Sequence, residues 1–201
     1  RSVVMKAPPT PQNLPLKDER FRNLAAALDY AADDRTGYNF NANQDRLQIA
    51  LPYALLRYEA RSLARGLLAL DLERGARVAL VADTSPDFVR FFFACQYAGM
   101  TPVPLPAKIQ LGGHREYTGQ LERLLSICQA DVAIAGDGFL PFLEEAASRL
   151  DIRFAGSPQA FAALPASTAP LCPQEPDELA YLQYTSGSTG APKGVLHTTA
   201  G

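Results

Sequence analysis

Apolar residues recur every three or four positions in five stretches of the chain, which is the spacing of a helix that buries one face. We predict helices at residues 21–33, 52–70, 86–98, 121–128 and 141–150. In the second helix, Arg57, Arg61 and Arg65 fall outside the apolar stripe, and we interpret them as a solvated surface rather than a binding patch. In the third, phenylalanines occupy nearly every face. This predicts a helix buried between layers by core packing rather than the wall of a fatty-acid channel.

Unbroken apolar runs predict buried strands between these helices. Such runs occupy residues 77–82 and 131–135, and shorter strands are expected at 101–106, at 152–154, near Tyr38 and near Leu47. Prolines at every second position of 101–106 remove N–H donors, so we predict that this strand is not fully paired on both sides. Residues 112–115 are predicted to form a loop. Strand and helix alternate three times, which indicates an α/β fold with a mainly parallel sheet covered by helices.

Proline-rich stretches divide the chain into four parts. We predict an extended lead-in at 1–20, an α/β subdomain at 21–163, a proline-rich connection at 164–178, and a strand–loop–strand unit at 179–201 that opens the next part of the domain. The last residues resemble the approach to a helix, so we expect the chain to be a fragment of a longer protein.

Composition narrows the class of protein. With 47% hydrophobic and 20% charged residues, the chain is typical of a soluble globular protein. A net charge of −2 argues against broad attraction to nucleic acid, and no apolar run approaches the roughly 18 residues of a membrane span. The three cysteines, Cys95, Cys128 and Cys172, are predicted to be buried free thiols in a reducing, cytoplasmic setting. The two histidines lack zinc-ligand spacing, and we predict no metal ligands in this chain.

The stretch Tyr184–Gly194 concentrates chemistry-bearing residues. It holds four serine and threonine hydroxyls, three glycines and one lysine between two apolar runs. Glycine lets the backbone approach a ligand closely, hydroxyls supply donors and lysine supplies charge, a combination suited to phosphate. The Walker A pattern requires Ser or Thr after the lysine, but Gly194 follows Lys193 and the next residues predict a strand. We therefore predict a phosphate-binding loop between two strands, most simply a hairpin.

This stretch, Y-T-S-G-S-T-G-A-P-K-G, resembles the signature loop of the adenylate-forming superfamily. That superfamily includes acyl-CoA synthetases, luciferases, peptide-synthetase adenylation domains and fatty acyl-AMP ligases. Further stretches, at 77–80, 86–88, 93–99 and 102–105, are similar to its first strand–helix–strand unit. The resemblance runs from about residue 47 to the end and implies the first part of the superfamily's large N-terminal domain.

Within the superfamily, three features resemble the fatty acyl-AMP ligase branch: residues 181–184, the prolines of 102–106 followed by Gly112 and Gly113, and residues 117–129. One feature departs from it. Pro192-Lys193-Gly194, which that branch often lacks, is present, and residues 195–199 are closer to short-chain acyl-CoA synthetases. The resemblance therefore leaves the acyl acceptor open between a carrier-protein thiol and coenzyme A.

The resemblance implies that the full-length protein uses ATP and Mg²⁺ to convert a fatty acid to acyl-AMP with release of pyrophosphate. An acyl carrier protein or CoA then accepts the acyl group. The residues implied to hold the β- and γ-phosphates are Thr185, Ser186, Gly187, Ser188, Thr189 and Gly190. Lys193, the catalytic candidate, would neutralise charge there or lock the loop.

Adenine contacts, an acidic Mg²⁺ ligand and a C-terminal-domain lysine are expected beyond Gly201, so the 201 residues alone should bind ATP weakly without turnover. A non-catalytic adenylation-like binding module is the alternative from another class. The completeness of the loop argues against it.

Overall fold

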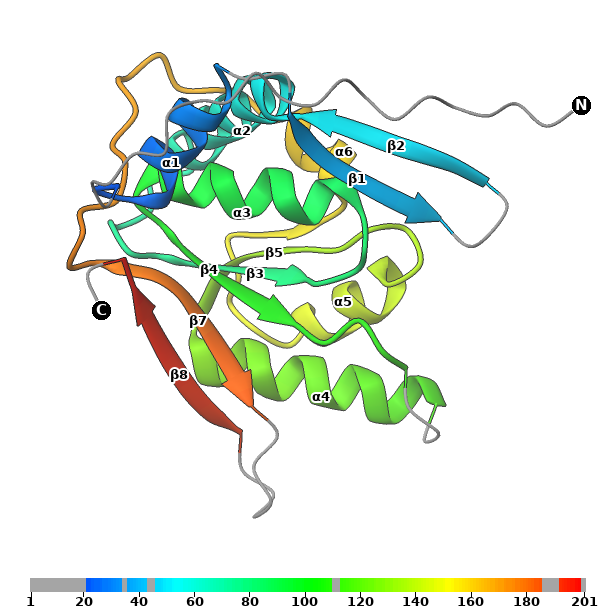
Figure 1. Ribbon diagram of the computed structural model, residues 1–201. Coiled ribbons are helices and arrows are strands. Elements are labelled where there is room, and N and C mark those ends of the chain that lie inside the picture. The colour runs from blue at the N-terminus through cyan, green and yellow to red at the C-terminus, as the bar shows by residue number, and fades with distance from the viewer. Residues whose placement is uncertain (1–20, 34–35, 43–45, 110–112, 186–191, 200–201) are drawn as a thin grey trace, which may run out of the picture.

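A four-stranded parallel sheet forms the centre of the molecule (Figure 1). This computed structural model describes residues 21–33, 36–42, 46–109, 113–185 and 192–199. The strands lie in the order β4-β3-β5-β6, and their bounds are β3 Arg77–Val81, β4 Thr101–Leu105, β5 Ala130–Ile134 and β6 Phe154–Gly156. Val78 and Leu80 enter one apolar cluster while Ala79 and Val81 enter another. Both faces of the sheet are therefore buried, which explains the unbroken apolar run of β3.

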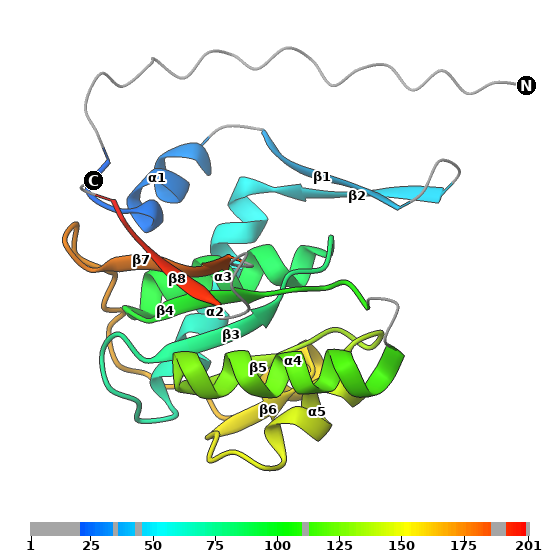
Figure 2. The ribbon, with the colours of Figure 1, turned by 90° about the horizontal axis from the view of Figure 1, so that it is seen from below.

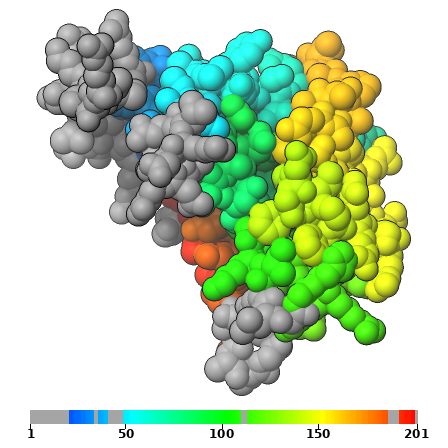
Figure 3. Space-filling model, turned by 90° about the vertical axis from the view of Figure 1, so that its right-hand side faces the viewer, coloured from blue at the N-terminus to red at the C-terminus, as the bar shows by residue number. Residues whose placement is uncertain are grey.

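Helices cover both faces of this sheet (Figure 2). One face is covered by α1 Leu24–Ala31, α2 Tyr53–Leu68, α3 Pro86–Ala98 and α6 Pro158–Ala162, and the other by α4 Gly113–Cys128 and α5 Leu140–Ala147. Residues from α4 to α6, green to yellow-orange, occupy much of the face shown in Figure 3. Phe91 of α3 is buried, and its ring meets that of Phe161 edge-on with centroids 5.2 Å apart. Phe88, Phe92 and Phe93 are only partly buried against the same cluster, so the predicted core packing holds fully for Phe91 and in part for the others.

The strand with alternating prolines lies at the edge of the sheet. Within the described residues, β4 pairs only with β3, with Val78 opposite Pro102 and Leu80 opposite Pro104. Thr101 N donates to the carbonyl of Ala76 at 2.9 Å, so the pairing uses the non-proline positions. The prediction that this strand is not paired on both sides is confirmed.

Two antiparallel hairpins lie outside the parallel sheet. The first joins β1 Gly37–Ala42 to β2 Arg46–Pro52 and confirms the strands predicted near Tyr38 and Leu47. The second joins β7 Leu179–Thr185 to β8 Lys193–Thr198 and confirms the predicted hairpin. The second hairpin lies against β4 but forms a separate two-stranded sheet (Figure 1).

Residues 164–178, which we call the connector, link α6 to β7. Arg74 fixes this segment: its guanidinium donates to both carboxylate oxygens of Glu178, at 2.5 and 2.6 Å, and to the carbonyls of Cys172 and Pro173, at 3.1 and 2.7 Å. The hydrogen bond from Arg74 lowers the pKa of Glu178. The connector therefore follows a defined path, although the domain boundaries at 163 and 178 stay predictions.

Several boundaries differ from the prediction: α1 begins at Leu24 rather than at 21, and α5 ends at Ala147 rather than at 150. Residues 113–115 form the first turn of α4 rather than a loop, while Gly112 lies outside the described residues. That turn is held by His114, whose Nε2 lies 2.5 Å from Glu145 Oε2 and whose ring lies 4.6 Å from that of Phe142. The short strand predicted at 152–154 is instead Phe154–Gly156. It begins at Phe154 because this residue is the first to pair with β5, opposite Val132.

Two further features were missed or misjudged. Helix α6 was not predicted, although Ser157 caps it by accepting a hydrogen bond from Ala160 N at 3.1 Å and Pro158 occupies its first turn. Cys95 and Cys128 are buried as predicted, but Cys172 is exposed because it lies in the connector rather than in a helix of the core.

Candidate functional site

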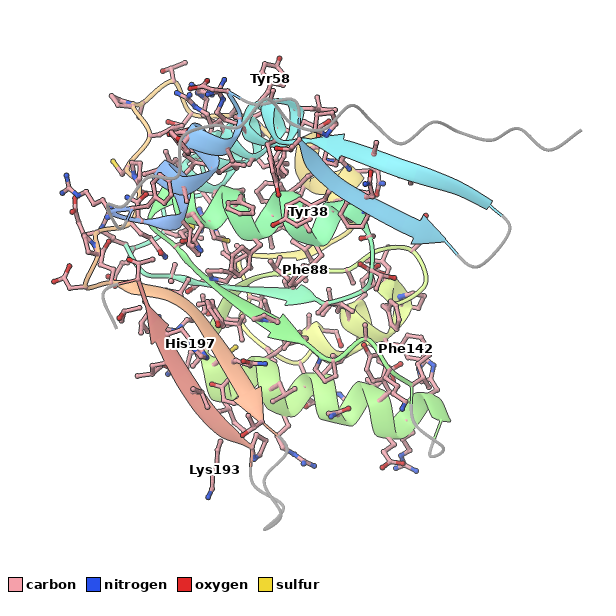
Figure 4. All side chains as sticks on the ribbon, viewed as in Figure 1. Tyr38, Tyr58, Phe88, Phe142, Lys193 and His197 are labelled. Atoms are coloured by element: carbon pink, nitrogen blue, oxygen red, sulfur yellow. The ribbon has the colours of Figure 1, made fainter. Side chains whose placement is uncertain are left out.

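The β7–β8 hairpin brings Thr185 and Lys193 to the same place. They are paired in register at the loop end of the hairpin, and Thr185 Oγ1 donates to the carbonyl of Lys193 at 3.4 Å. Both residues are exposed, and Lys193 extends outward from the start of β8 (Figure 4). Residues 186–191, which include the predicted phosphate ligands Ser186, Gly187, Ser188, Thr189 and Gly190, lie outside the described residues.

The charge of Lys193 is available to a ligand. No described carboxylate lies within ion-pair distance of its Nζ, whereas Arg22, Arg57, Arg74, Arg90 and Arg149 all have carboxylate partners. Thr185 Oγ1 can also accept a hydrogen bond or exchange its weak contact for a stronger acceptor. The two described ends of the predicted loop thus carry one cation and one hydroxyl, which suit an anionic ligand.

An aromatic ring supports the backbone next to these two residues. Tyr184 lies opposite Gly194, and a Cβ at Gly194 would sit 3.3 Å from Tyr184 Cε1 and 3.4 Å from Leu182 Cδ1. Glycine therefore lets the Tyr184 ring lie close against β8. Burial raises the pKa of Tyr184, with a smaller contribution from Cys128. The tyrosine thus stays neutral and packs against the core.

A second aromatic contact joins the two strands further from the loop. The rings of Tyr181 and His197 stack with centroids 4.1 Å apart and planes at 11°. The Tyr181 ring also lies 5.9 Å from that of Phe92 in α3. His197 Nε2 is buried and has no hydrogen-bond partner among the described residues. These stacked rings tie β8 to β7 and to helix α3.

Two functional candidates escaped the sequence analysis. Gln96 and Gln174 are almost completely buried polar residues whose side chains bond to the base of the hairpin. Gln96 could have been noticed as an amide within the apolar run Ala94–Ala98. Gln174 lies between prolines of the connector, where no periodic pattern marks a buried position.

The described residues hold neither a cluster of metal ligands nor a helix of membrane-spanning character. Among the described residues, no three His, Cys, Asp or Glu side chains gather closely enough to hold a metal ion. In the same part of the chain, no helix has the length and apolarity needed to cross a membrane.

Comparison with known proteins places this geometry in a family. The model of the AMP-binding enzyme family matches residues 31–201. A putative acyl-CoA synthetase of Caulobacter vibrioides is 42% identical over 193 residues, covering 94% of this chain and 32% of the relative. The medium-chain-fatty-acid–[acyl-carrier-protein] ligase JamA of Moorena producens is 32% identical over 185 residues, covering 89% of this chain and 31% of the ligase.

Solved structures agree with the sequence comparison. A structure from a study of fatty acyl-adenylate ligases of E. coli and L. pneumophila superposes with a TM-score of 0.83 at 42% identity. The match covers 89% of this chain and 32% of that one, so the chain spans about a third of the length of such relatives. Since the family model covers most of the residues, this chain belongs to the AMP-binding enzyme family.

Proposed function

We propose that the full-length protein activates a fatty acid with ATP, forming acyl-AMP and releasing pyrophosphate, and then passes the acyl group to a carrier-protein thiol. The observation that carries this proposal is the register pairing of Thr185 and Lys193 at the two ends of the loop of the Tyr184–Gly194 motif. The fatty acid is suggested by relatives at 42% and 32% identity whose names specify fatty acyl-adenylate and medium-chain fatty-acid ligases.

The reaction requires stabilisation of negative charge. A carboxylate oxygen attacks the α-phosphorus of ATP, the bond from that phosphorus to the bridging oxygen breaks, and pyrophosphate leaves with the electron pair. Charge that builds on the leaving group is best met by preorganised cations and donors. In the proposal Lys193 Nζ supplies the cation and Thr185 Oγ1 a donor, and residues 186–190 supply the remaining phosphate contacts.

The two described ends of the loop fit ATP. The ammonium of Lys193, which has no described carboxylate partner, and the exposed hydroxyl of Thr185 lie opposite each other on neighbouring strands. Mg²⁺ would accompany the nucleotide and neutralise its phosphates. No described carboxylate is assigned to it, since no metal-ligand cluster occurs in the part of the chain that the structure describes.

The experiment is fatty-acid-dependent ATP–pyrophosphate exchange by the full-length protein. Lys193→Ala should lower kcat/KM for ATP by about 100-fold, the typical cost of removing a group that stabilises developing charge. Lys108→Ala is the matched control, because Lys108 is an exposed lysine outside the hairpin, and it should leave the exchange rate unchanged. Exchange that survives Lys193→Ala intact would remove this lysine from the reaction.

The acceptor is a separate question. One relative is named as a carrier-protein ligase and another as a putative acyl-CoA synthetase. Incubating the acyl-AMP formed in situ with a holo carrier protein or with CoA, and detecting the thioester by mass spectrometry, distinguishes them. The proposal expects the carrier-protein thioester to form faster. CoA ester alone would move the protein to the acyl-CoA synthetases.

A non-catalytic adenylation-like module is the other candidate. It would bind ATP without fatty-acid-dependent exchange, and Lys193→Ala would change nothing beyond nucleotide affinity. The 201 residues alone should bind ATP weakly and give no exchange, because they span about a third of their relatives. Turnover by the 201-residue chain would contradict the proposal that further parts of the full-length protein are needed for catalysis.

A further inference from the structure

The base of the β7–β8 hairpin is fastened by two buried glutamines. Gln96 of α3 is completely buried, and its Nε2 donates to the carbonyl of Ala180 at 2.7 Å. Gln174 of the connector donates from Nε2 to the carbonyls of Met100, at 2.5 Å, and Leu179, at 2.7 Å. The glutamines are themselves linked, since Gln174 N donates to the carbonyl of Gln96 at 3.0 Å. Side-chain amides therefore hold the first two residues of β7.

These bonds take the place of a backbone ladder. Among the described residues β7 pairs only with β8, although it lies along β4. Leu182 packs into the apolar cluster that contains Val103 and Leu105, but apolar contact is non-directional and tolerates sliding. Hydrogen bonds restrict both distance and angle. The glutamine amides therefore define where the hairpin sits along its own axis.

Gln96 is an unfavourable residue for stability alone. Its Oε1 is buried and has no partner among the described residues, and an unpaired buried polar atom costs free energy. Methionine has a similar length without that cost. The amide at this position therefore suits a requirement for a directional bond to Ala180 rather than for core packing.

We propose that Gln96 and Gln174 are positioning residues that fix Thr185 and Lys193 relative to the parallel sheet. This inference rests on the proposed function. Thr185 lies five residues beyond Ala180, about 17 Å along an extended strand. Because β7 is stiffened by its ladder with β8, a shift at the base is carried to Thr185 and Lys193.

The test measures kinetics in the full-length protein with Gln96→Met and Gln174→Met. Each variant should raise KM for ATP about tenfold, since small displacements of binding groups are costly, while KM for the fatty acid stays unchanged. A merely structural role would reduce the fraction of active enzyme, lowering kcat with both KM values unchanged. That second pattern would overturn the proposal.

Two further measurements complete the test. Thr118→Val, which removes a buried hydroxyl without a hydrogen-bond partner in the described chain, is the control and should leave KM for ATP unchanged. In a Lys193→Ala background the effect of Gln96→Met should shrink, because both changes act on the same loop. If the effects of Gln96→Met and Lys193→Ala on kcat/KM for ATP were fully additive, the two residues would not act through the same loop.

Hydrogen exchange separates this inference from the proposed function. Amides of β7 and β8 should exchange faster in both glutamine variants, with those of α4 unchanged. If the wild-type protein shows no fatty-acid-dependent ATP–pyrophosphate exchange, the proposed function is wrong, but the anchoring role of the two glutamines is not affected. Unaltered amide exchange in the hairpin would overturn the anchoring role whether or not the enzyme is active.

Discussion

β3 and β7 are both strands next to β4, yet they are held in opposite ways. β3 has a backbone ladder on each side, and all but its first residue are buried. β7 has a ladder only to β8 within the described chain, alternates between buried and accessible residues, and ends in exposed Thr185. Most of the buried apolar residues therefore lie in or against the parallel sheet, while the candidate chemistry lies on a hairpin that packs one face on the core and is held at its base by side-chain hydrogen bonds. Substitutions in the two regions should have separable effects.

The largest effect is expected in the sheet. Leu80 of β3 is 2% exposed and lies in the core cluster on the α2–α3 face. Leu80→Ala should lower the free energy of unfolding by about 3 kcal/mol, because it removes buried methyl groups and leaves a cavity. Urea unfolding of the purified protein measures this. A loss below about 1 kcal/mol would mean that the sheet relaxes around the cavity and is no more sensitive to substitution than the hairpin.

On the hairpin, stability and activity should separate. Thr185→Val keeps the branched shape but removes the hydroxyl of an exposed residue. The free energy of unfolding should change by less than about 0.5 kcal/mol. In contrast, kcat/KM for ATP should fall about tenfold, or about 1.4 kcal/mol, from the loss of one donor to phosphate. A large loss of stability with unchanged kinetics would reverse the roles assigned to the two regions.

The connector between the regions should show an intermediate, pH-dependent effect. Arg74→Met removes the bonds to Glu178 and should cost about 1 kcal/mol at pH 7, because the pair is partly exposed. Arg74 lowers the pKa of Glu178 in the folded protein. The ion-pair contribution is therefore present above the pKa of glutamate in the unfolded chain, about 4.3, and is lost as pH falls through the lower folded value.

The difference in urea midpoint between wild type and Arg74→Met should accordingly shrink below about pH 4. Glu178→Gln should remove this acid-dependent part while keeping an acceptor for Arg74. A difference that is the same at pH 7 and pH 3 would show that the carbonyl contacts to Cys172 and Pro173, and not the ion pair, hold the connector.

The smallest expected effect is a difference in reactivity without a change in stability. Cys172 of the connector is exposed, whereas burial raises the pKa of the Cys128 thiol to about 11 and that of Cys95 well above the usual range. Iodoacetamide at pH 8 should label Cys172 alone among these three, because the thiolate is the nucleophile. Peptide mass spectrometry identifies the site. Labelling of Cys128 in the native protein would indicate that the α4 layer opens readily.

Much of the sheet could be predicted from local pattern. The apolar run of β3 and the apolar stripes of α2 and α3 reflect burial, and burial is visible in a sequence as the spacing of its apolar residues. The paired prolines of β4 predicted incomplete pairing because they lack a donor. Helix α6 carries the same serine–proline signal as α3, at Ser157 and Pro158, but the helix has only five residues, too few for a periodic pattern.

The candidate site was only partly predictable. Its loop composition and the hairpin followed from the order of glycines, hydroxyls and apolar runs around Tyr184–Gly194. The anchoring of that hairpin did not, because Gln96 and Gln174 contact residues 84 and 74 positions away in the sequence, at Ala180 and Met100. Such bonds depend on how layers pack, and no spacing rule encodes them.

The prolines of β4 have a consequence for self-association. Thr101 donates its N–H toward β3, so with the alternation of a strand the positions of Pro102 and Pro104 face the opposite edge. That edge therefore lacks the donors that another strand would need, and an exposed edge without them resists the edge-to-edge joining that leads to aggregates. The hairpin can therefore lie beside β4 without becoming a fifth strand of the parallel sheet.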